Sequence, residues 1–454
     1  MVRPRRRSLS GRRVCCAPAV VLCLSACSLA WGDAASGEIH QYCGEAFAIV
    51  IGSPHSYKGG VNGSAEILVE QWLKTPLPDI ATLVVNAGPG GPEAEDKEFY
   101  LLKEKGRFLI FVFWGNRTGD GRLGSIIKIG EKGELPRSLF LRCLDPQPKT
   151  VDELAEQIRR VLSMEYQDGL VKTLGDPTQR DPVRAAAARN LGGLYARHAW
   201  AALQTQATAA GRPEEDATIR ESLLALFRIG EVKTVPICLR LVHTSRYAAQ
   251  VGTCAWLLSR RPSDDPTALD VLLDAANRWE QEAPNEDHPL PELIQAVTAL
   301  GKKTSEVEVL VMRCVEKGTG NVLVTAMEAA GHFRLRRAVP YICQALARRD
   351  KVYDYRPSAS AALAGFVADE FHPYSANRPV SEEDARQSAA AGFPEWKAAI
   401  LAAPTVECFR GDRVVCASRG DKSLYVLVGW QSQVDRPIPF LKTLLLYQSE
   451  KLDK

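Results

Sequence analysis

Between residues 37 and 145, short apolar runs alternate with loops rich in glycine and proline, a pattern typical of β-strands and turns. The strongest run is Arg107–Trp114, where apolar and aromatic residues follow one another almost without a break. The other runs are Phe47–Ile51, Ala65–Glu70, Ala81–Val85 and Ser125–Ile129. Five short strands separated by such loops predict a small closed or partly open β-barrel.

From residue 150 onward, the apolar positions change to helical spacing. Thr150 is an expected N-cap, and Glu153 stands three residues later, as in a capping box. Leu154, Ile158 and Val161 then fall on one face of a helix that is expected to end near residue 164. This helix is expected to join the β-rich region to the segments that follow.

Between about residues 168 and 370 the chain repeats itself. The segment LLALFRIGEVKTVPICLRLV, which begins at Leu223, aligns with AMEAAGHFRLRRAVPYICQAL, which begins at Ala326. Each predicts a helix, a glycine, a short basic linker, and a second apolar helix that opens with Val-Pro. Landmark glycines or equivalent positions recur at spacings of roughly 30 to 41 residues, near the period of helical-repeat proteins.

These segments resemble HEAT-type repeats, in which an Asp-Pro-Val-Arg start like that of Asp181–Tyr195 opens a helix. The resemblance implies about five stacked helix pairs, each covering the apolar face of its neighbour. We expect Gly230 and Gly331 to end helices in a left-handed turn, and Pro236 and Pro340 to lie in the first turn of the next helix.

The strand region also resembles the netrin-like module, an OB-type barrel shared with tissue inhibitors of metalloproteinases. The resemblance rests on an early cysteine, Cys43, and on the segments FAIVIG, AEILVEQWLK and KGRFLIFV. It covers roughly a quarter of the chain. The paired cysteines near the start of that family are reduced to one here, and Cys43 is preceded by several residues. Protease inhibition is therefore not carried over.

After residue 403 the pattern becomes strand-like again, with apolar runs near Val414–Cys416, Leu424–Val428 and Thr443–Tyr447. The fold class expected from the whole pattern is multidomain α+β: a small N-terminal β-barrel, an α-α superhelix (HEAT-like solenoid) and a short C-terminal β element. The expected domains are a signal segment at 1–32, an OB/netrin-like domain at 37–148, the solenoid at 150–403 and a small β element or cap at 404–454.

The first residues have the pattern of an export signal. Arginines cluster within residues 1–13, and Val14–Ala26 is an apolar run too short to span a bilayer comfortably. Leu24–Cys27 resembles a lipobox, which would make Cys27 a lipidated first residue and attach the protein to a membrane. Alternatively, Ala30–Gly32 offers the small residues that a conventional signal peptidase reads. Both outcomes predict an exported protein: in the cell envelope, periplasmic or membrane-anchored, or secreted.

Net charge and cysteine positions bear on which ligands and cross-links to expect. The net charge of +3 comes partly from the N-terminal arginines, so a basic face for nucleic acid is not expected. Four of the twelve cysteines precede residue 28. In an exported chain, Cys43 with Cys143 and Cys408 with Cys416 are candidate disulfides. Four further cysteines stand at apolar helix positions, where buried thiols are expected: Cys238, Cys254, Cys314 and Cys343.

No residue cluster predicts a catalytic centre. The seven histidines are scattered, no cysteine spacing suggests zinc, and neither a Gly-x-Ser-x-Gly elbow nor a phosphate loop is present. We therefore expect no catalytic, cofactor-binding or metal-binding residues and no cofactor. The expected function is an exported, non-catalytic protein-binding or scaffolding protein that uses the solenoid to hold a protein or peptide partner. The alternative is an enzyme whose site lies at the junction of barrel and solenoid.

Overall fold

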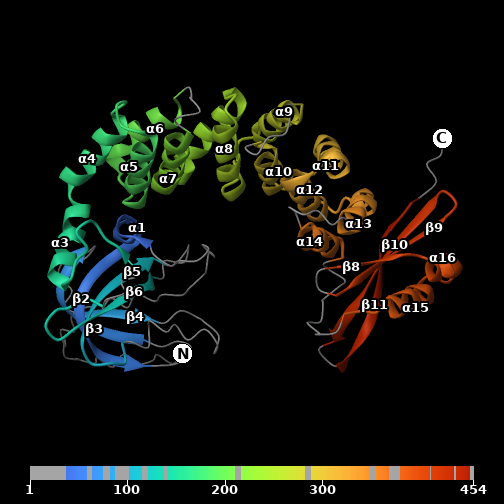
Figure 1. Cartoon of the computed structure of the whole chain (residues 1–454), viewed down its shortest axis with the longest axis horizontal. Coiled ribbons are helices and arrows are strands. Elements are labelled where there is room, and N and C mark those ends of the chain that lie inside the picture. The colour runs from blue at the N-terminus through green and yellow to red at the C-terminus, as the bar shows by residue number, and fades with distance from the viewer. Residues whose placement is uncertain are drawn as a thin grey trace, which may run out of the picture. The chain divides into compact units, whose positions relative to one another are not determined.

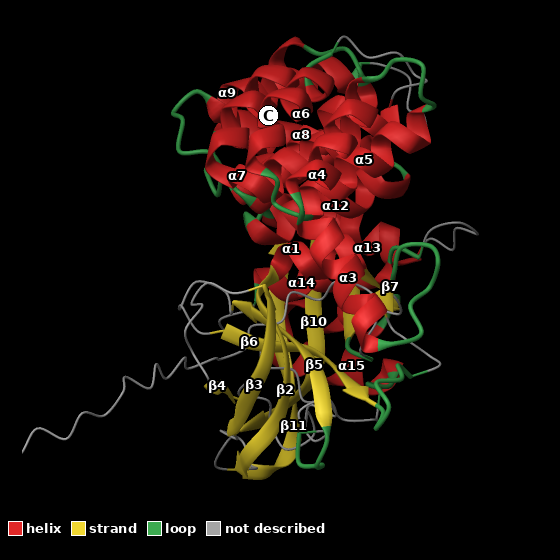
Figure 2. Ribbon diagram, turned by 90° about the vertical axis from the view of Figure 1, so that its left-hand side faces the viewer, coloured by secondary structure: helices red, strands yellow, loops and turns green. Residues whose placement is uncertain are grey.

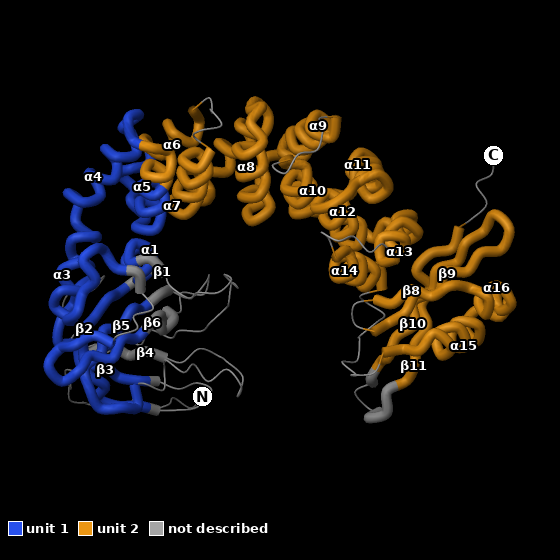
Figure 3. Tube along the Cα trace, viewed as in Figure 1, with its two compact units in different colours: residues 1–179, 186–200 blue, residues 180–185, 201–454 orange. Residues whose placement is uncertain are grey.

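The computed structural model of the chain describes residues 37–58, 64–74, 82–86, 102–114, 121–136, 141–209, 216–281, 288–347, 354–367, 379–408, 411–433 and 436–449 (Figure 1). Two compact units divide the chain (Figure 3): residues 1–179 with 186–200, and residues 180–185 with 201–454. Along the sequence, helices (red in Figure 2) separate two groups of strands. The two units are described in turn.

The first unit contains a five-stranded antiparallel sheet. Its strands are β2 (Ala46–Lys58), β3 (Ser64–Lys74), β4 (Thr82–Asn86), β5 (Arg107–Trp114) and β6 (Gly121–Ile129). They lie in the order β4-β3-β2-β5-β6. The predicted strands are therefore present, but the prediction of a closed barrel is wrong for the described residues, in which no ladder joins β4 to β6. A physical reason is that β4 has only five residues, against nine in β6, so its free edge offers little backbone for a ladder although the two strands contact each other.

Both faces of the central strands are buried. On one face Val50, Ile67 and Phe108 belong to a single apolar cluster. On the other, Phe111 is fully buried and meets the ring of Tyr42 edge to face at 5.5 Å. Tyr42 belongs to the short helix α1 (Ile39–Glu45), which packs against β2 and β5. A strand buried on both sides explains why β5 reads as an almost unbroken apolar run.

The first unit continues with helices. They are α3 (Val151–Leu162), α4 (Met164–Gly175) and most of α5 (Asp181–Gly193). The capping box predicted at the start of α3 is confirmed, because the Thr150 side chain accepts from the Glu153 N–H while the Glu153 carboxylate reaches back to the Thr150 N–H. Two short strands, β1 (Gly37–Glu38) and β7 (Leu141–Arg142), pair in parallel beside them.

The second unit is built from stacked helices, which confirms the prediction of a helical repeat. They are α6 (Trp200–Ala207), α7 (Asp216–Thr244), α8 (Ala248–Arg260), α9 (Ala268–Glu280), α10 (Leu290–Ala299), α11 (Ser305–Lys317), α12 (Gly320–His332), α13 (Val339–Ala347) and α14 (Arg356–Phe366). One row is formed by α8, α10, α12 and α14, each of which contacts the next (Figure 1). Helices α9, α11 and α13 form a second row and contact α10, α12 and α14 respectively. Each pair thus buries an apolar face against its neighbours.

The helix-ending residues differ from those expected. Gly230 interrupts α7 with an extended backbone (φ −160°) and is not left-handed, and Gly331 lies inside α12. The left-handed residue is Arg334 (φ 53°), whose N–H bonds the carbonyl of Gly331 at 3.2 Å. The next N–H, that of Leu335, bonds the carbonyl of Ala330 at 2.9 Å. This pair of bonds is a Schellman cap with a non-glycine residue in the left-handed position.

The same cap occurs at the end of α5. Tyr195 (φ 53°) donates to the carbonyl of Gly192 at 3.1 Å, and Ala196 donates to that of Leu191 at 3.1 Å. A turn of 3-10 helix follows in both places, at Arg197–Ala199 and at Arg336–Ala338. Recurrence of one cap in two parts of the chain is the local signature of the repeat. The prediction for Pro340 is confirmed, because it is the second residue of α13, whereas Pro236 lies inside α7.

Gly331 has a packing role instead of a turning role. A Cβ atom placed on it would lie 2.7 Å from Cα and 2.8 Å from the carbonyl oxygen of Ala362 in α14. In return, a Cβ atom placed on Gly365 of α14 would lie 3.0 Å from the carbonyl oxygen of Gly331. Helices α12 and α14 therefore approach each other backbone to backbone, which only glycine allows at this crossing.

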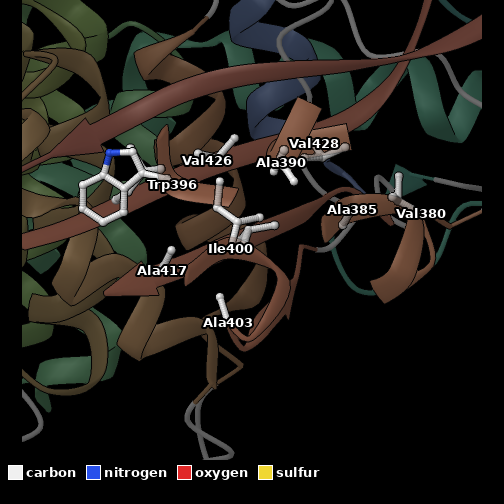
Figure 4. Close-up of a cluster of buried hydrophobic side chains, with 12 residues drawn as sticks. Val380, Ala385, Ala390, Trp396, Ile400, Ala403, Ala417, Val426 and Val428 are labelled. Carbon is white, nitrogen blue, oxygen red and sulfur yellow. The ribbon is translucent and has the colours of Figure 1, made fainter. Parts of the chain in front are cut away.

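The C-terminal β element is a four-stranded antiparallel sheet in the order β11-β10-β9-β8. The strands are β8 (Thr405–Glu407), β9 (Arg413–Arg419), β10 (Lys422–Gln433) and β11 (Arg436–Gln448). Helices α15 (Glu382–Gly392) and α16 (Lys397–Leu401) pack on one face, where Trp396, Ile400 and Val426 share a buried cluster (Figure 4). In addition, α13 contacts β8, and the turn before α13 contacts β11. The sheet is thus tied to the last stacked helices as well as to α15 and α16.

Candidate functional site

One face of α8 lines an open hollow of about 400 Å³ in the second unit, which we call the α8 groove. Five half-buried residues of that helix share the face because they are linked by steps of three or four residues. They are Ala248, Ala249, Gly252, Thr253 and Trp256. The other walls come from α7, through Arg220 and Leu224, and from the start of α10, through Pro289 and Glu292. The hollow stays open because most of the residues that α8 contributes are small. The ring of Trp256 forms one end of the hollow.

The groove has free space next to Gly252, enough for a further side-chain atom. A Cβ atom on Gly252 would lie 3.6 Å from the nearest side-chain atom, that of Pro289, and 3.9 Å from the Glu292 carboxylate. These are ordinary van der Waals distances. Unlike Gly331, Gly252 is therefore not required by helix packing, and its absent side chain leaves part of the hollow open.

The groove carries one positive and one negative side chain on opposite walls. The side chain of Arg220 is 61% exposed, and its guanidinium lies 3.6 Å from the Glu221 carboxylate, an ion pair that water largely screens. Glu292 is mostly buried, and this burial raises the pKa of its carboxyl above the ordinary value. Next to the aromatic end, the guanidinium of Arg260 stacks over the Trp256 ring at 5.2 Å from its centre.

The histidine beside the groove has a structural role. Nε2 of His288 is 2.7 Å from the carbonyl oxygen of Trp279, so this nitrogen must carry the proton and donate it. Its Nδ1 accepts from the N–H of Leu290 at 3.4 Å. Both ring nitrogens are thus engaged with the backbone, which leaves His288 unsuited to act as a base or a ligand.

The remaining polar group on the α8 face is also engaged, since the Thr253 hydroxyl donates to the carbonyl of Ala249 at 2.7 Å. The groove lining therefore contains no pair of nucleophile and base. Its chemistry is that of a binding surface: small apolar side chains, one aromatic ring and two opposite charges.

A second hollow, of about 640 Å³, lies in the first unit between α3 and residues 144–149. Its polar side chains serve the local fold. The Gln157 amide bonds the N–H of Leu144 and the carbonyls of Leu144 and Pro146, and Glu153 caps α3. We therefore regard the α8 groove as the stronger candidate.

The cysteines predicted to pair lie in both units. Cys43 and Cys143 are near enough to influence each other, and burial raises the pKa of Cys43 to about 12 and that of Cys143 to about 11. Cys408 and Cys416 lie beside each other in the second unit. All eight cysteines within the described ranges are free thiols, so the two disulfides stay predictions. Cys27, the predicted lipidation site, lies outside the described residues.

Sequence reasoning did not find the α8 groove. The signal that would have indicated it is the row of small residues at helical spacing that ends in Trp256. Within the part of the chain that the structure describes, no three or more histidine, cysteine or acidic side chains gather as they would around a metal ion. An enzyme site at the junction of the N-terminal sheet and the helical repeat stays a prediction.

The fold and the groove define a helical-repeat protein with a β-sheet in the N-terminal and in the C-terminal part of its sequence. No family model and no curated protein matches the chain. Among solved structures, it is similar to the complex of CpcE and CpcF of phycocyanin lyase from Nostoc sp. PCC7120, with 19% identity, a TM-score of 0.33, and coverage of 44% of this chain and 76% of that one. At that level of similarity the assignment rests on the helix packing described above. None of the described helices is both long and apolar enough to cross a membrane.

Proposed function

We propose that this protein is an exported, non-catalytic binding protein that holds a peptide segment of a protein partner in the α8 groove. The groove carries the proposal, because it is an open hollow on a row of stacked helices whose polar groups are arranged to bind and not to react. The basic, then apolar, first 26 residues support export, and Cys27 supports attachment to a membrane through a lipid.

We also propose a HEAT-type assignment for the stacked helices and an OB-type, netrin-like assignment for the N-terminal sheet. The two-row packing of α8 to α14 supports the first. The strand order β4-β3-β2-β5-β6 supports the second, because its two edge strands approach each other and need only one further ladder to close a five-stranded barrel.

The lining of the groove indicates what kind of segment would bind. Alanine and glycine on α8 allow the backbone of an extended peptide to approach closely. The Trp256 ring offers a surface for an apolar or aromatic side chain, and Arg220 offers a partner for a carboxylate. The preferred ligand is therefore an extended segment with an apolar residue and a nearby acidic residue.

Filling the groove should weaken this binding. We expect Gly252→Leu to weaken the binding of peptides selected from a random displayed library on the wild-type protein by at least about tenfold, since the new side chain occupies the hollow. The measurement is fluorescence anisotropy of the labelled peptides. Gly252→Ala is the matched control, because its single methyl group fits at ordinary contact distances and should change the affinity by far less.

Thermal unfolding of both variants would show that the fold is retained. The outcome that contradicts the proposed function is equal affinity of the selected peptides for the wild type and for folded Gly252→Leu. Export is tested separately by mass spectrometry of the mature N-terminus. An N-terminus at Cys27 with an added lipid would support the lipoprotein outcome, and an unprocessed chain starting at Met1 would contradict cleavage of the signal segment.

A further inference from the structure

Three cysteines from separate parts of the second unit meet where the stacked helices contact the C-terminal sheet. Cys343 belongs to α13, Cys416 to β9, and Cys408 follows β8. Helix α13 contacts β8, which pairs with β9, and the Cys416 N–H bonds the carbonyl of Pro404 just before β8. The side chains of Cys343 and Cys416 are close enough to share a hydrogen bond, and Cys408 is close enough to act on both electrostatically. Cys416 lies on the face of β9 opposite to Val415 and Ala417, which pack on α15 and α16. It therefore lies on the face of β9 that α15 and α16 do not cover, and α13 contacts the neighbouring strand β8.

The position of Cys416 sets it apart from the other two cysteines. It is half-buried, whereas Cys343 is 3% and Cys408 6% exposed. The hydrogen bond from Cys343 stabilises a thiolate and lowers the pKa of Cys416. Burial, with the negative charge of Asp412 nearby, raises the pKa of Cys408 to about 12, so Cys408 stays protonated.

We propose that Cys416 and Cys343 form a reversible thiol–disulfide pair that joins α13 to β9, with a low-molecular-weight disulfide as the co-reactant. Two sulfurs within hydrogen-bonding distance need only small side-chain rotations to reach the S–S bond length of about 2.05 Å. This pairing is an alternative to the Cys408–Cys416 cystine that the sequence predicts. It joins two secondary-structure elements, whereas Cys408–Cys416 would join the ends of one hairpin.

The exchange proceeds in two balanced steps. The thiolate of Cys416 attacks one sulfur of the small disulfide, forms a mixed disulfide and releases one small thiolate, which takes up a proton. Cys343 then loses its proton to solvent, attacks the sulfur of Cys416 and expels the second small thiol. The two cysteines are oxidised by two electrons, and the small disulfide is reduced to two thiols.

A second pair of cysteines serves as an internal reference. Cys238 in α7 and Cys254 in α8 also share a hydrogen bond, but both are at most 1% exposed, and burial raises the pKa of Cys254 well above its ordinary value. These thiols touch each other without access for a co-reactant. Reaction in the folded state should therefore distinguish the Cys343–Cys416 pair from the Cys238–Cys254 pair.

The test treats the reduced, folded full chain with oxidised glutathione and maps cross-linked peptides by mass spectrometry. We expect a Cys343–Cys416 cystine, with a Cys416–glutathione mixed disulfide at early times. We also expect a thiol reagent to label Cys416 about tenfold faster than the other cysteines of the described residues. A Cys408–Cys416 cystine, or only free thiols after oxidation, would overturn the proposal.

Three substitutions separate what Cys343 and Cys408 contribute to the cystine and to the labelling rate of Cys416. Cys343→Ser keeps a hydroxyl donor for the Cys416 thiolate, so fast labelling should persist while the cystine is lost. Cys343→Ala removes the donor, so the labelling rate of Cys416 should fall about tenfold as well. Cys408→Ala should leave both the cystine and the labelling rate unchanged, and loss of the cystine in that variant would contradict the assigned pairing.

Discussion

Replacement of Gly331 by alanine is expected to destabilise the helical repeat by about 3 kcal/mol, although a methyl group is the smallest side chain that can be added. The added atom would lie 2.7 Å from Cα of Ala362, and backbone cannot rotate away as a flexible side chain can. Relief requires α12 and α14 to separate, which also loosens the buried contacts on either side. Urea unfolding monitored by circular dichroism measures the effect.

Gly252→Ala is the matched control for this result, because it makes the same chemical change in α8, another helix of the same row. Its methyl group meets nothing closer than 3.6 Å, so the higher helix propensity of alanine should stabilise the protein by about 1 kcal/mol. We therefore expect the two substitutions to change the free energy of unfolding in opposite directions. Equal effects of the two substitutions would show that the close crossing of α12 and α14 is not rigid.

Acidification from pH 7 to pH 4 is expected to remove about 3 kcal/mol of stability through one histidine. His40 in α1 is buried in the first unit, with its Nε2 2.7 Å from the Tyr166 hydroxyl, and burial lowers its pKa from 6.5 to about 4. Below pH 6.5 the unfolded chain binds a proton that the folded chain does not. Unfolding is therefore favoured progressively as the pH falls from 6.5 to 4, and the effect levels off below pH 4.

His40→Gln isolates this contribution, because glutamine can still bond the Tyr166 hydroxyl but has no proton to gain in this range. Urea midpoints of the two proteins at pH 7 and pH 4 give the difference between the two losses. All other ionisable groups are the same in the two proteins, so their contributions cancel in that difference. Parallel losses in both proteins would contradict a buried, neutral His40.

The sequence pattern was sufficient to predict those helices and strands in which the element's own apolar residues form the buried face. Helix α11 buries Val307, Leu310, Val311 and Cys314, positions that follow helical spacing and need no knowledge of their neighbours. The capping box at Thr150 is likewise a local feature, set by two side chains three residues apart. The strand at 107–114 could be predicted because it is buried on both faces and has no polar face to obscure the pattern.

Features that depend on distant parts of the chain could not be predicted in this way. Gly331 was expected to turn the chain, but the backbone of Ala362 in another helix decides its role. Arg334 and Tyr195 take the left-handed conformation although neither is a residue that favours it, since the cap bonds hold them there. The α8 groove depends on Arg220 and Glu292 from two other helices, and barrel closure depends on a ladder between edge strands.

The sheet in the C-terminal part of the chain contacts the last stacked helices and also supports α15 and α16. An array of stacked helix pairs has no intrinsic length, because every pair presents to the next the same kind of surface that it receives. A β-sheet on the final pair does not offer a helix of the following repeat a matching ridge and groove. The sheet therefore covers the C-terminal end of the array, and an insertion of further helix pairs would have to occur before it.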